Sequence, residues 1–115
     1  MPYSRGDVVL VLFPDSNLRT AKRRPALIVQ ADNSHTSLPQ TIIAMITSNL
    51  GRAGYPSRIR ISLASAEGRQ TGLLTDSVIM KDNVATVLDV EIDRRIGTYP
   101  DHHALDTALR HTFAL

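Results

Sequence analysis

Short runs of successive apolar residues constrain the fold of this chain most. Four such runs, five or six residues long and each with at most one polar residue, occupy positions 8–13, 26–30, 41–46 and 84–88. Neighbouring side chains on a strand point to opposite faces, so a run without a polar face must be buried on both sides. The runs therefore predict a small, mainly β protein whose core covers both faces of its strands.

Weaker strand signals lie between and after these runs. Residues 58–63 alternate strictly between polar and apolar side chains, which predicts a half-exposed strand with Arg58 and Arg60 on its wet face. Residues 72–80 predict a further strand that polar residues interrupt in its middle. Turns are expected at two places, residues 67–69 and residues 81–83.

The last part of the chain changes to a helical period. After the charged residues 89–95 and Gly97, Asp101 can cap a terminal helix in which Leu105 and Phe113 share an apolar face. Five or six strands in so short a chain would leave costly unpaired edges if the sheet stayed open. The expected fold is therefore a small closed β-barrel with a C-terminal helix.

Length and composition limit the architecture and the compartment. With 115 residues, 43% of them hydrophobic, the chain has room for one domain, expected over residues 1–115. No apolar run approaches the roughly 18 residues of a membrane span, and the first residues lack the apolar stretch of a signal peptide. The absence of cysteine agrees with a reducing compartment. These features predict a cytoplasmic protein with no membrane partner.

Charge is distributed unevenly along the chain. Residues 1–70 contain nine Lys and Arg against four Asp and Glu, whereas residues 71–115 contain four against seven, which together give the net charge of +2. Eleven of the thirteen cations are arginine, whose planar guanidinium suits phosphate groups and stacking on bases. The basic first half therefore favours a nucleic-acid partner.

Arg24 is the cation that the sequence places most firmly. It follows Lys22 and Arg23 and precedes Pro25, whose ring disfavours a helical conformation for the residue before it. Arg24 is thus expected in extended geometry at the entrance of the strand 26–30, where a rigid, permanently charged fork can bind a phosphate. The alternative is a basic turn that only keeps the strand end solvated.

Two loops supply further candidate contacts to a nucleic acid. The polar and basic loop 14–23 is long for a tight hairpin, and loops of this length tend to carry function. The loop 49–57 combines glycine, cations and one aromatic ring, although such a loop is often only a solvated hairpin tip. The candidate residues for binding the nucleic acid are Arg19, Lys22, Arg23, Arg52 and Tyr55 in these loops, and Arg58 at the start of the next strand.

Motifs of several other chemistries are missing from the sequence. It contains no glycine-rich phosphate loop before a helix, no Cys/His spacing typical of a metal site and no nucleophile elbow. The adjacent His102 and His103 diverge on the expected helix and are interpreted as surface residues of its first turn.

Four short motifs in register across the chain resemble one known family. They are Arg5-Gly6-Asp7-Val8, Arg24-Pro25-Ala26-Leu27-Ile28-Val29, Ile46-Thr47-Ser48, and Gly72-Leu73 followed by Asp76-Ser77-Val78, Asp82 and Thr86. In order and spacing they resemble the PemK/MazF, or Kid-like, toxins of type II toxin-antitoxin systems. The tail, with Ile92, Arg95, Ile96 and Gly97 before an amphipathic helix, is similar to that family as well.

The resemblance implies a fold, an activity and a set of partners. Members are homodimeric SH3-like or CcdB-like barrels that cut single-stranded RNA at short sequences without a metal or other cofactor. A cognate antitoxin silences them by covering the active groove. The family's catalytic arginine and threonine correspond here to Arg24 and Thr47, and an acidic residue used by some members corresponds to Asp76 or Asp82.

The chemistry of metal-free RNA cleavage agrees with these assignments. The neighbouring 2′-hydroxyl attacks phosphorus, so the site must stabilise charge on the phosphoryl oxygens. Arg24 can do so electrostatically and Thr47 by hydrogen bonding. Asp76, Asp82 and His35 are the candidates for the base. On their own, Thr47 could instead satisfy a backbone group at a strand end, and Asp82 could be a turn residue.

The chain also departs from the family pattern. Before Arg24, where members often carry Glu or Gln and glycines, stand residues 18–23, so the antitoxin contacts and the RNA sequence preference stay open. Arg23 could share the phosphate contact of Arg24, and Thr75 occupies a position that is basic in many members. A second hypothesis is a non-catalytic binder on the same barrel, either an RNA-binding module or a protein resembling gyrase inhibitors.

Overall fold

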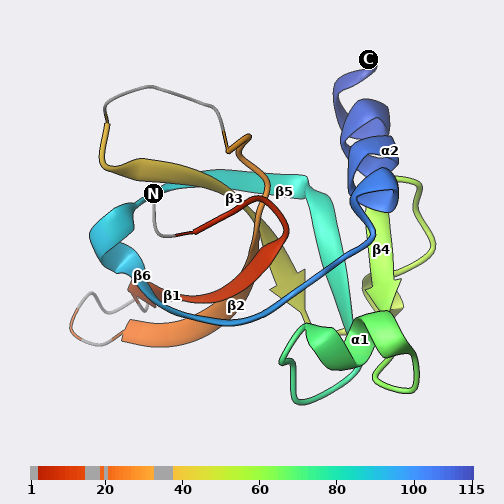
Figure 1. Ribbon diagram of the computed structural model, residues 1–115, viewed down its shortest axis with the longest axis horizontal. Coiled ribbons are helices and arrows are strands. Elements are labelled where there is room, and N and C mark those ends of the chain that lie inside the picture. The colour runs from red at the N-terminus through yellow and green to blue at the C-terminus, as the bar shows by residue number, and fades with distance from the viewer. Residues whose placement is uncertain (1–2, 15–18, 20, 33–37) are drawn as a thin grey trace.

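The computed structural model describes residues 3–14, 19, 21–32 and 38–115. Within them, six strands form one antiparallel sheet in the order β4-β5-β3-β2-β1-β6. Figure 1 shows this sheet curling around the core, with α2 beside β4. The elements are β1 (Asp7–Pro14), β2 (Ala21–Ile28), β3 (Gln40–Thr47), η1 (Leu50–Arg52), β4 (Arg58–Ile61), α1 (Ala66–Gln70), β5 (Ser77–Leu88), η2 (Asp89–Glu91), β6 (Ile92–Thr98) and α2 (His102–Phe113).

The prediction of a mainly β fold with a C-terminal helix is confirmed, but the sheet does not close. Strands β4 and β6 stand at its two ends and are not paired with each other. Closure is not needed to protect these edges, because β4 is only four residues long and β6 carries Asp93, Arg94 and Arg95. Short length and charge both discourage pairing with another chain. In the described part of the chain, no helix is long and apolar enough to span a membrane.

The core has two parts, one on each face of the central strands. The first contains Val8, Leu27, Ala44, Ile46, Ile61, Ile79, Tyr99 and Leu105. The second contains Val9, Val11, Ala26, Ile28, Ile43, Val87 and Ile92. Successive residues such as Val8 and Val9 therefore enter different parts of the core, which confirms that these strands are buried on both faces.

The second strand begins earlier than the sequence pattern indicates. β2 starts at Ala21, so Arg24 lies inside the strand opposite Val11 rather than at its entrance. Its predicted extended geometry is confirmed. β2 pairs with β3 only from Ala26 onward, and Pro25, which has no N–H to donate, is the last residue before this pairing begins.

Both predicted turns belong to regular elements. Residues 67–69 lie in α1, where the hydroxyl of Ser65 accepts the N–H of Gly68 at 2.9 Å and so supplies a cap that the pattern did not reveal. Residues 81–83 lie inside β5 as a three-residue bulge, because the neighbouring residues Ala44 and Met45 of β3 pair with Val84 and Met80. One long strand, which begins only at Ser77, therefore replaces the two predicted ones, and residues 72–76 lie outside it.

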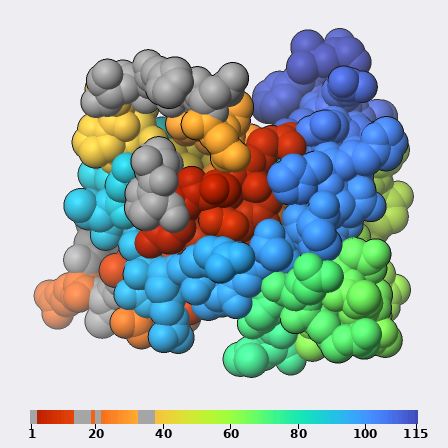
Figure 2. Space-filling view, in the orientation of Figure 1, coloured from red at the N-terminus to blue at the C-terminus, as the bar shows by residue number. Residues whose placement is uncertain are grey.

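The strand β6 begins within the charged residues 89–95 and was not predicted from the sequence. β6 pairs with β1, and Figure 2 shows the N-terminal strand in red bordered by the blue chain of β6 and α2. An edge strand needs only one apolar face, so its composition resembles that of a loop. The predicted helix cap is confirmed, since the carboxylate of Asp101 accepts the N–H of Ala104 at 3.0 Å.

Two glycines bring the segment after α1 against β6. A Cβ on Gly72, whose φ is +73°, would lie 2.0 Å from the carbonyl oxygen of Ile96, and a Cβ on Gly97 would lie 2.3 Å from the carbonyl carbon of Thr71. Only residues without a side chain permit this backbone approach. It places Leu73 and Thr75 at the border of the cavity described next.

Candidate active site

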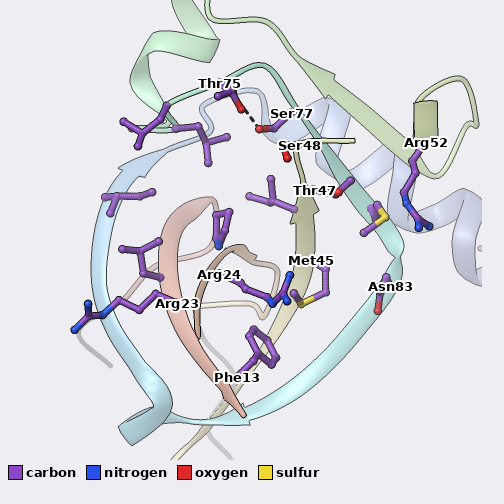
Figure 3. A pocket seen from close by; sticks show the side chains of 18 of the residues that line it. Phe13, Arg23, Arg24, Met45, Thr47, Ser48, Arg52, Thr75, Ser77 and Asn83 are labelled. Atoms are coloured by element: carbon purple, nitrogen blue, oxygen red, sulfur yellow. Dashed lines mark hydrogen bonds between the residues drawn. The ribbon is translucent and has the colours of Figure 1, made fainter. Parts of the chain in front are cut away.

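A cavity of about 870 Å³ lies among five strands and the segment after α1. Figure 3 shows the side chains that line it. Its cations are Arg23, Arg24, Arg52 and Arg94, and its hydroxyl groups are those of Thr47, Ser48, Thr75 and Ser77. Of the described residues that line it, none is acidic and none is histidine. The cavity is therefore positively charged and suited to an anionic ligand.

Arg24 and Thr47 line the cavity where two neighbouring strands separate. Ala26 of β2 lies opposite Met45 of β3, and the same register, continued by two residues, would set Arg24 opposite Thr47. The pairing stops at Ala26, so the strand ends part and both side chains line the cavity. The two predicted catalytic residues thus lie on the parts of β2 and β3 that are not paired with each other, Arg24 inside β2 and Thr47 at the end of β3.

The guanidinium of Arg24 is exposed to the cavity. Figure 3 shows its side chain reaching toward Met45 on β3. It forms no hydrogen bond or ion pair with the described residues. Its five N–H donors are consequently available to a phosphate.

Thr47 combines a structural contact with a free hydrogen. Its hydroxyl oxygen accepts the N–H of Asn49 at 3.1 Å, so it does satisfy a backbone group at the end of the strand. A threonine hydroxyl can accept and donate at the same time. This contact fixes the oxygen and leaves the hydrogen to be donated into the cavity.

The two candidate carboxylates lie outside the cavity lining. Asp76 accepts the N–H of Leu63 at 2.8 Å. Asp82 forms a bidentate pair with Arg58, with Nε–Oδ1 at 3.2 Å and Nη2–Oδ2 at 3.1 Å. The hydrogen bonds from Arg58 lower the pKa of Asp82 below its usual value, which makes it a weaker base. His35, the third candidate base, lies outside the described residues.

The predicted RNA contacts are not all in one place. Arg23 and Arg52 line the cavity, although Arg23 is paired with Asp93 at 3.0 Å. Arg19 and Lys22 are exposed but do not belong to the lining. Arg94 lines the cavity and was missed, because its charged segment carried no recognisable strand signal.

Arg58 is not on a wet strand face as predicted. Its side chain is only 19% exposed, because besides pairing with Asp82 it lies 4.7 Å from the ring centroid of Tyr55. It also donates to the carbonyl oxygen of Arg52 at 2.8 Å. Arg58 thus ties η1 to β5, whereas Arg60 is exposed as expected. Neither Arg58 nor Tyr55 lines the cavity.

A metal centre has no candidate ligand set in the described ranges. No group of three or more His, Cys, Asp or Glu side chains is close enough together there to hold an ion. The functional groups that face the cavity are guanidinium, hydroxyl and amide groups.

Residues 4–113 match the family of PemK-like, MazF-like toxins of type II toxin-antitoxin systems. The chain belongs to this toxin family. This MazF-like chain is 32% identical, over 119 aligned positions and the whole of both chains, to endoribonuclease MazF6 of Mycobacterium tuberculosis H37Rv. It is 28% identical over 118 positions to endoribonuclease EndoA of Bacillus subtilis, with 100% of this chain and 97% of that protein covered.

Solved MazF-like structures share the fold. An endoribonuclease from a mycobacterial species, in complex with its cognate antitoxin, superposes with a TM-score of 0.75 at 18% identity, over 98% of this chain and 96% of the other. The M. tuberculosis toxin MazF-mt6 gives 0.70 at 23% identity, over 93% and 97%. The predicted family, and the RNA-cleaving enzyme class of its members, are confirmed.

Proposed function

We propose that this toxin cleaves single-stranded RNA in the cavity that Arg24 and Thr47 share, without a metal ion or cofactor. The observation that carries the proposal is that these two residues, from neighbouring strands, line one cavity with four arginines and no acidic group in its described lining. A phosphodiester is an anion that such a set of donors can bind.

In the proposed reaction, the 2′-oxygen forms a bond to the neighbouring phosphorus and loses its proton, and the bond from phosphorus to the 5′-oxygen breaks. The products are a 2′,3′-cyclic phosphate and a 5′-hydroxyl, whose oxygen takes up a proton. Arg24 stabilises the charge that gathers on the phosphoryl oxygens, and Thr47 donates a hydrogen bond to one of them. The pKa of arginine is too high for efficient proton removal, so its part is electrostatic.

We assign positioning roles, rather than proton transfer, to Asp76 and Asp82. The carboxylate of Asp76 fixes the backbone at Leu63, just before α1. The pair between Asp82 and Arg58 fixes the β5 bulge, whose next residue, Asn83, does line the cavity. Both carboxylates therefore support the walls of the site from outside it.

RNA cleavage in the presence of EDTA is the direct test. We expect a long unstructured RNA to yield discrete fragments with cyclic phosphate ends, and these ends to define a short recognition sequence. Duplex RNA of the same sequence should stay intact, because its 2′-oxygen is not aligned for attack. Intact single strands across a randomised RNA pool, together with measurable binding, would instead support the non-catalytic binder.

We further propose that the toxin is a homodimer held through the face where α2 meets β3 and β5. Apolar side chains remain exposed there, with Ile42 at 38%, Leu88 at 50% and Phe113 at 56%. A groove of about 470 Å³ beside them is lined partly by Val84 and Leu109. Contiguous exposed apolar surface of this kind is typical of an interface. Sedimentation at micromolar concentration should give twice the 12.6 kDa of one chain, and a single-chain mass would contradict the proposal.

We also propose that a cognate antitoxin binds this toxin. Both proteins are expected in the cytoplasm, where RNA is accessible. The arginines of the cavity favour an acidic segment as the part that covers it. An excess of the antitoxin should then inhibit RNA cleavage in EDTA. High salt should weaken the complex between toxin and antitoxin.

A further inference from the structure

Arg94 approaches the cavity from the edge strand on the far side of β1 from Arg24. It lies opposite Leu10 of β1, and Leu10 in turn lies opposite Pro25 of β2. The backbones of Arg94 and Pro25 are therefore two strand spacings apart, which is about 10 Å. Pro25 directly follows Arg24. Leu10, Pro25 and both arginines line the same cavity.

The neighbours of Arg94 on β6 are neutralised, whereas Arg94 is not. Asp93 pairs with Arg23 at 3.0 Å, and Arg95 pairs with Asp7 at 3.1 Å. Arg94 is exposed and makes no ion pair with the described residues. The pairing of β6 with β1 is shifted twice, between Val8 and Val9 and between Leu10 and Val11, and such irregularities aim neighbouring side chains in different directions.

Cations that share a cavity without a counter-charge repel each other until an anion is bound. Among the described residues that line the cavity, Arg24, Arg52 and Arg94 make no ion pair. The surface between the backbones of Arg24 and Arg94 is apolar, since it consists of Leu10 and Pro25. A single polynucleotide strand offers a matching pattern, with phosphates at intervals and sugar or base surface between them.

We propose that Arg94 forms a second phosphate subsite, which binds an RNA phosphate next along the strand from the scissile phosphate held by Arg24. This inference rests on the proposed function, because it takes the bound polymer to be the RNA substrate. Arg94 is a binding residue in this scheme: it fixes the register of the strand and takes no part in bond breaking.

The test measures binding and cleavage separately. A labelled single-stranded RNA pool in which every 2′-hydroxyl is methylated cannot be cleaved by 2′-oxygen attack, so its affinity can be titrated at several salt concentrations. Wild type is compared with Arg94→Gln, with Arg94→Lys and with Arg95→Gln, the adjacent arginine of the same strand that pairs with Asp7. Thermal melting shows that each variant is folded at the assay temperature.

We expect Arg94→Gln to weaken binding by about three- to tenfold near 0.1 M salt and to reduce the slope of log K against log salt by about 0.7. Arg94→Lys keeps the charge and should keep the slope, and Arg95→Gln should change neither quantity. With cleavable RNA, Arg94→Gln should raise KM and leave kcat within about twofold, because uniform binding is what it removes.

Three outcomes overturn the inference. If wild type cleaves RNA and Arg94→Gln has the same KM and the same salt slope as wild type, Arg94 forms no subsite. The proposed function would then still hold. An equal loss of RNA affinity in Arg95→Gln would show that only the general charge of β6 matters. Absence of any RNA binding by wild type would remove both the subsite and the proposed function.

Discussion

Replacing Arg24 by alanine should lower the rate of RNA cleavage by about a hundredfold to a thousandfold, which is the usual cost of removing one preorganised donor to a developing anion. Arg24 is unpaired among the described residues, so its removal leaves no buried partner without a hydrogen bond. The folded state should consequently lose little stability. The loss is expected in kcat, measured under single-turnover conditions with saturating RNA in EDTA.

Arg60 provides the matched control for this variant. It is also an exposed arginine on a strand, but it lies on β4 and does not line the cavity. Arg60→Ala should cleave RNA at nearly the wild-type rate, which separates the loss of a placed donor from the loss of one positive charge. Wild-type rates in Arg24→Ala would exclude Arg24 from the active site.

Replacing Lys81 by methionine should stabilise the protein by roughly 3 to 5 kcal/mol at pH 7. Lys81 is wholly buried in β5, and its Nζ finds no hydrogen-bond partner in the described structure. Burial, and to a smaller extent the charge of Arg5, lower the pKa of Lys81 to about 7, although Asp106 acts in the opposite direction. The estimate follows from about 1.36 kcal/mol for each pH unit by which the pKa falls. Methionine fills a similar volume without a charge.

The lowered pKa of Lys81 also predicts how the stability of the wild type changes with pH. From pH 7 up to about 10.5, the ordinary pKa of lysine, the unfolded chain keeps Lys81 protonated while the folded chain releases the proton. The unfolded state then binds more protons, so wild-type stability should rise with pH across this range. The difference between wild type and Lys81→Met should shrink as the pH rises and stay constant below pH 7.

Chemical denaturation at several pH values measures this difference. Lys22→Met is the control, because Lys22 is the other lysine of the chain and is exposed on β2. It should alter the free energy of unfolding by less than about 0.5 kcal/mol at any pH. A pH-independent difference for Lys81→Met, or a loss of stability, would contradict an unpartnered Lys81 whose pKa falls to about 7 in the folded protein.

Local patterns were sufficient for the elements that are buried on both faces and for the terminal helix. The runs that became β1 and β3 leave no polar side, and the cap of α2 needs only Asp101 and the next turn. The motifs around Arg24 and Thr47 identified the family, because short motifs in a common order are a property of the chain. These features depend on residues close together in sequence, so their physical causes can be recognised there.

The remaining features depend on register between distant strands. The β5 bulge, the β6 edge strand and the opening of β2 from β3 exist only once the strands have paired. That pairing places Arg94 in the cavity, ties Asp82 to Arg58 and encloses Lys81. A charge in a linear sequence does not reveal whether it will meet a counter-charge, solvent or a core. Long-range packing decides this, because burial and ion pairing are set by neighbours that lie far away along the chain.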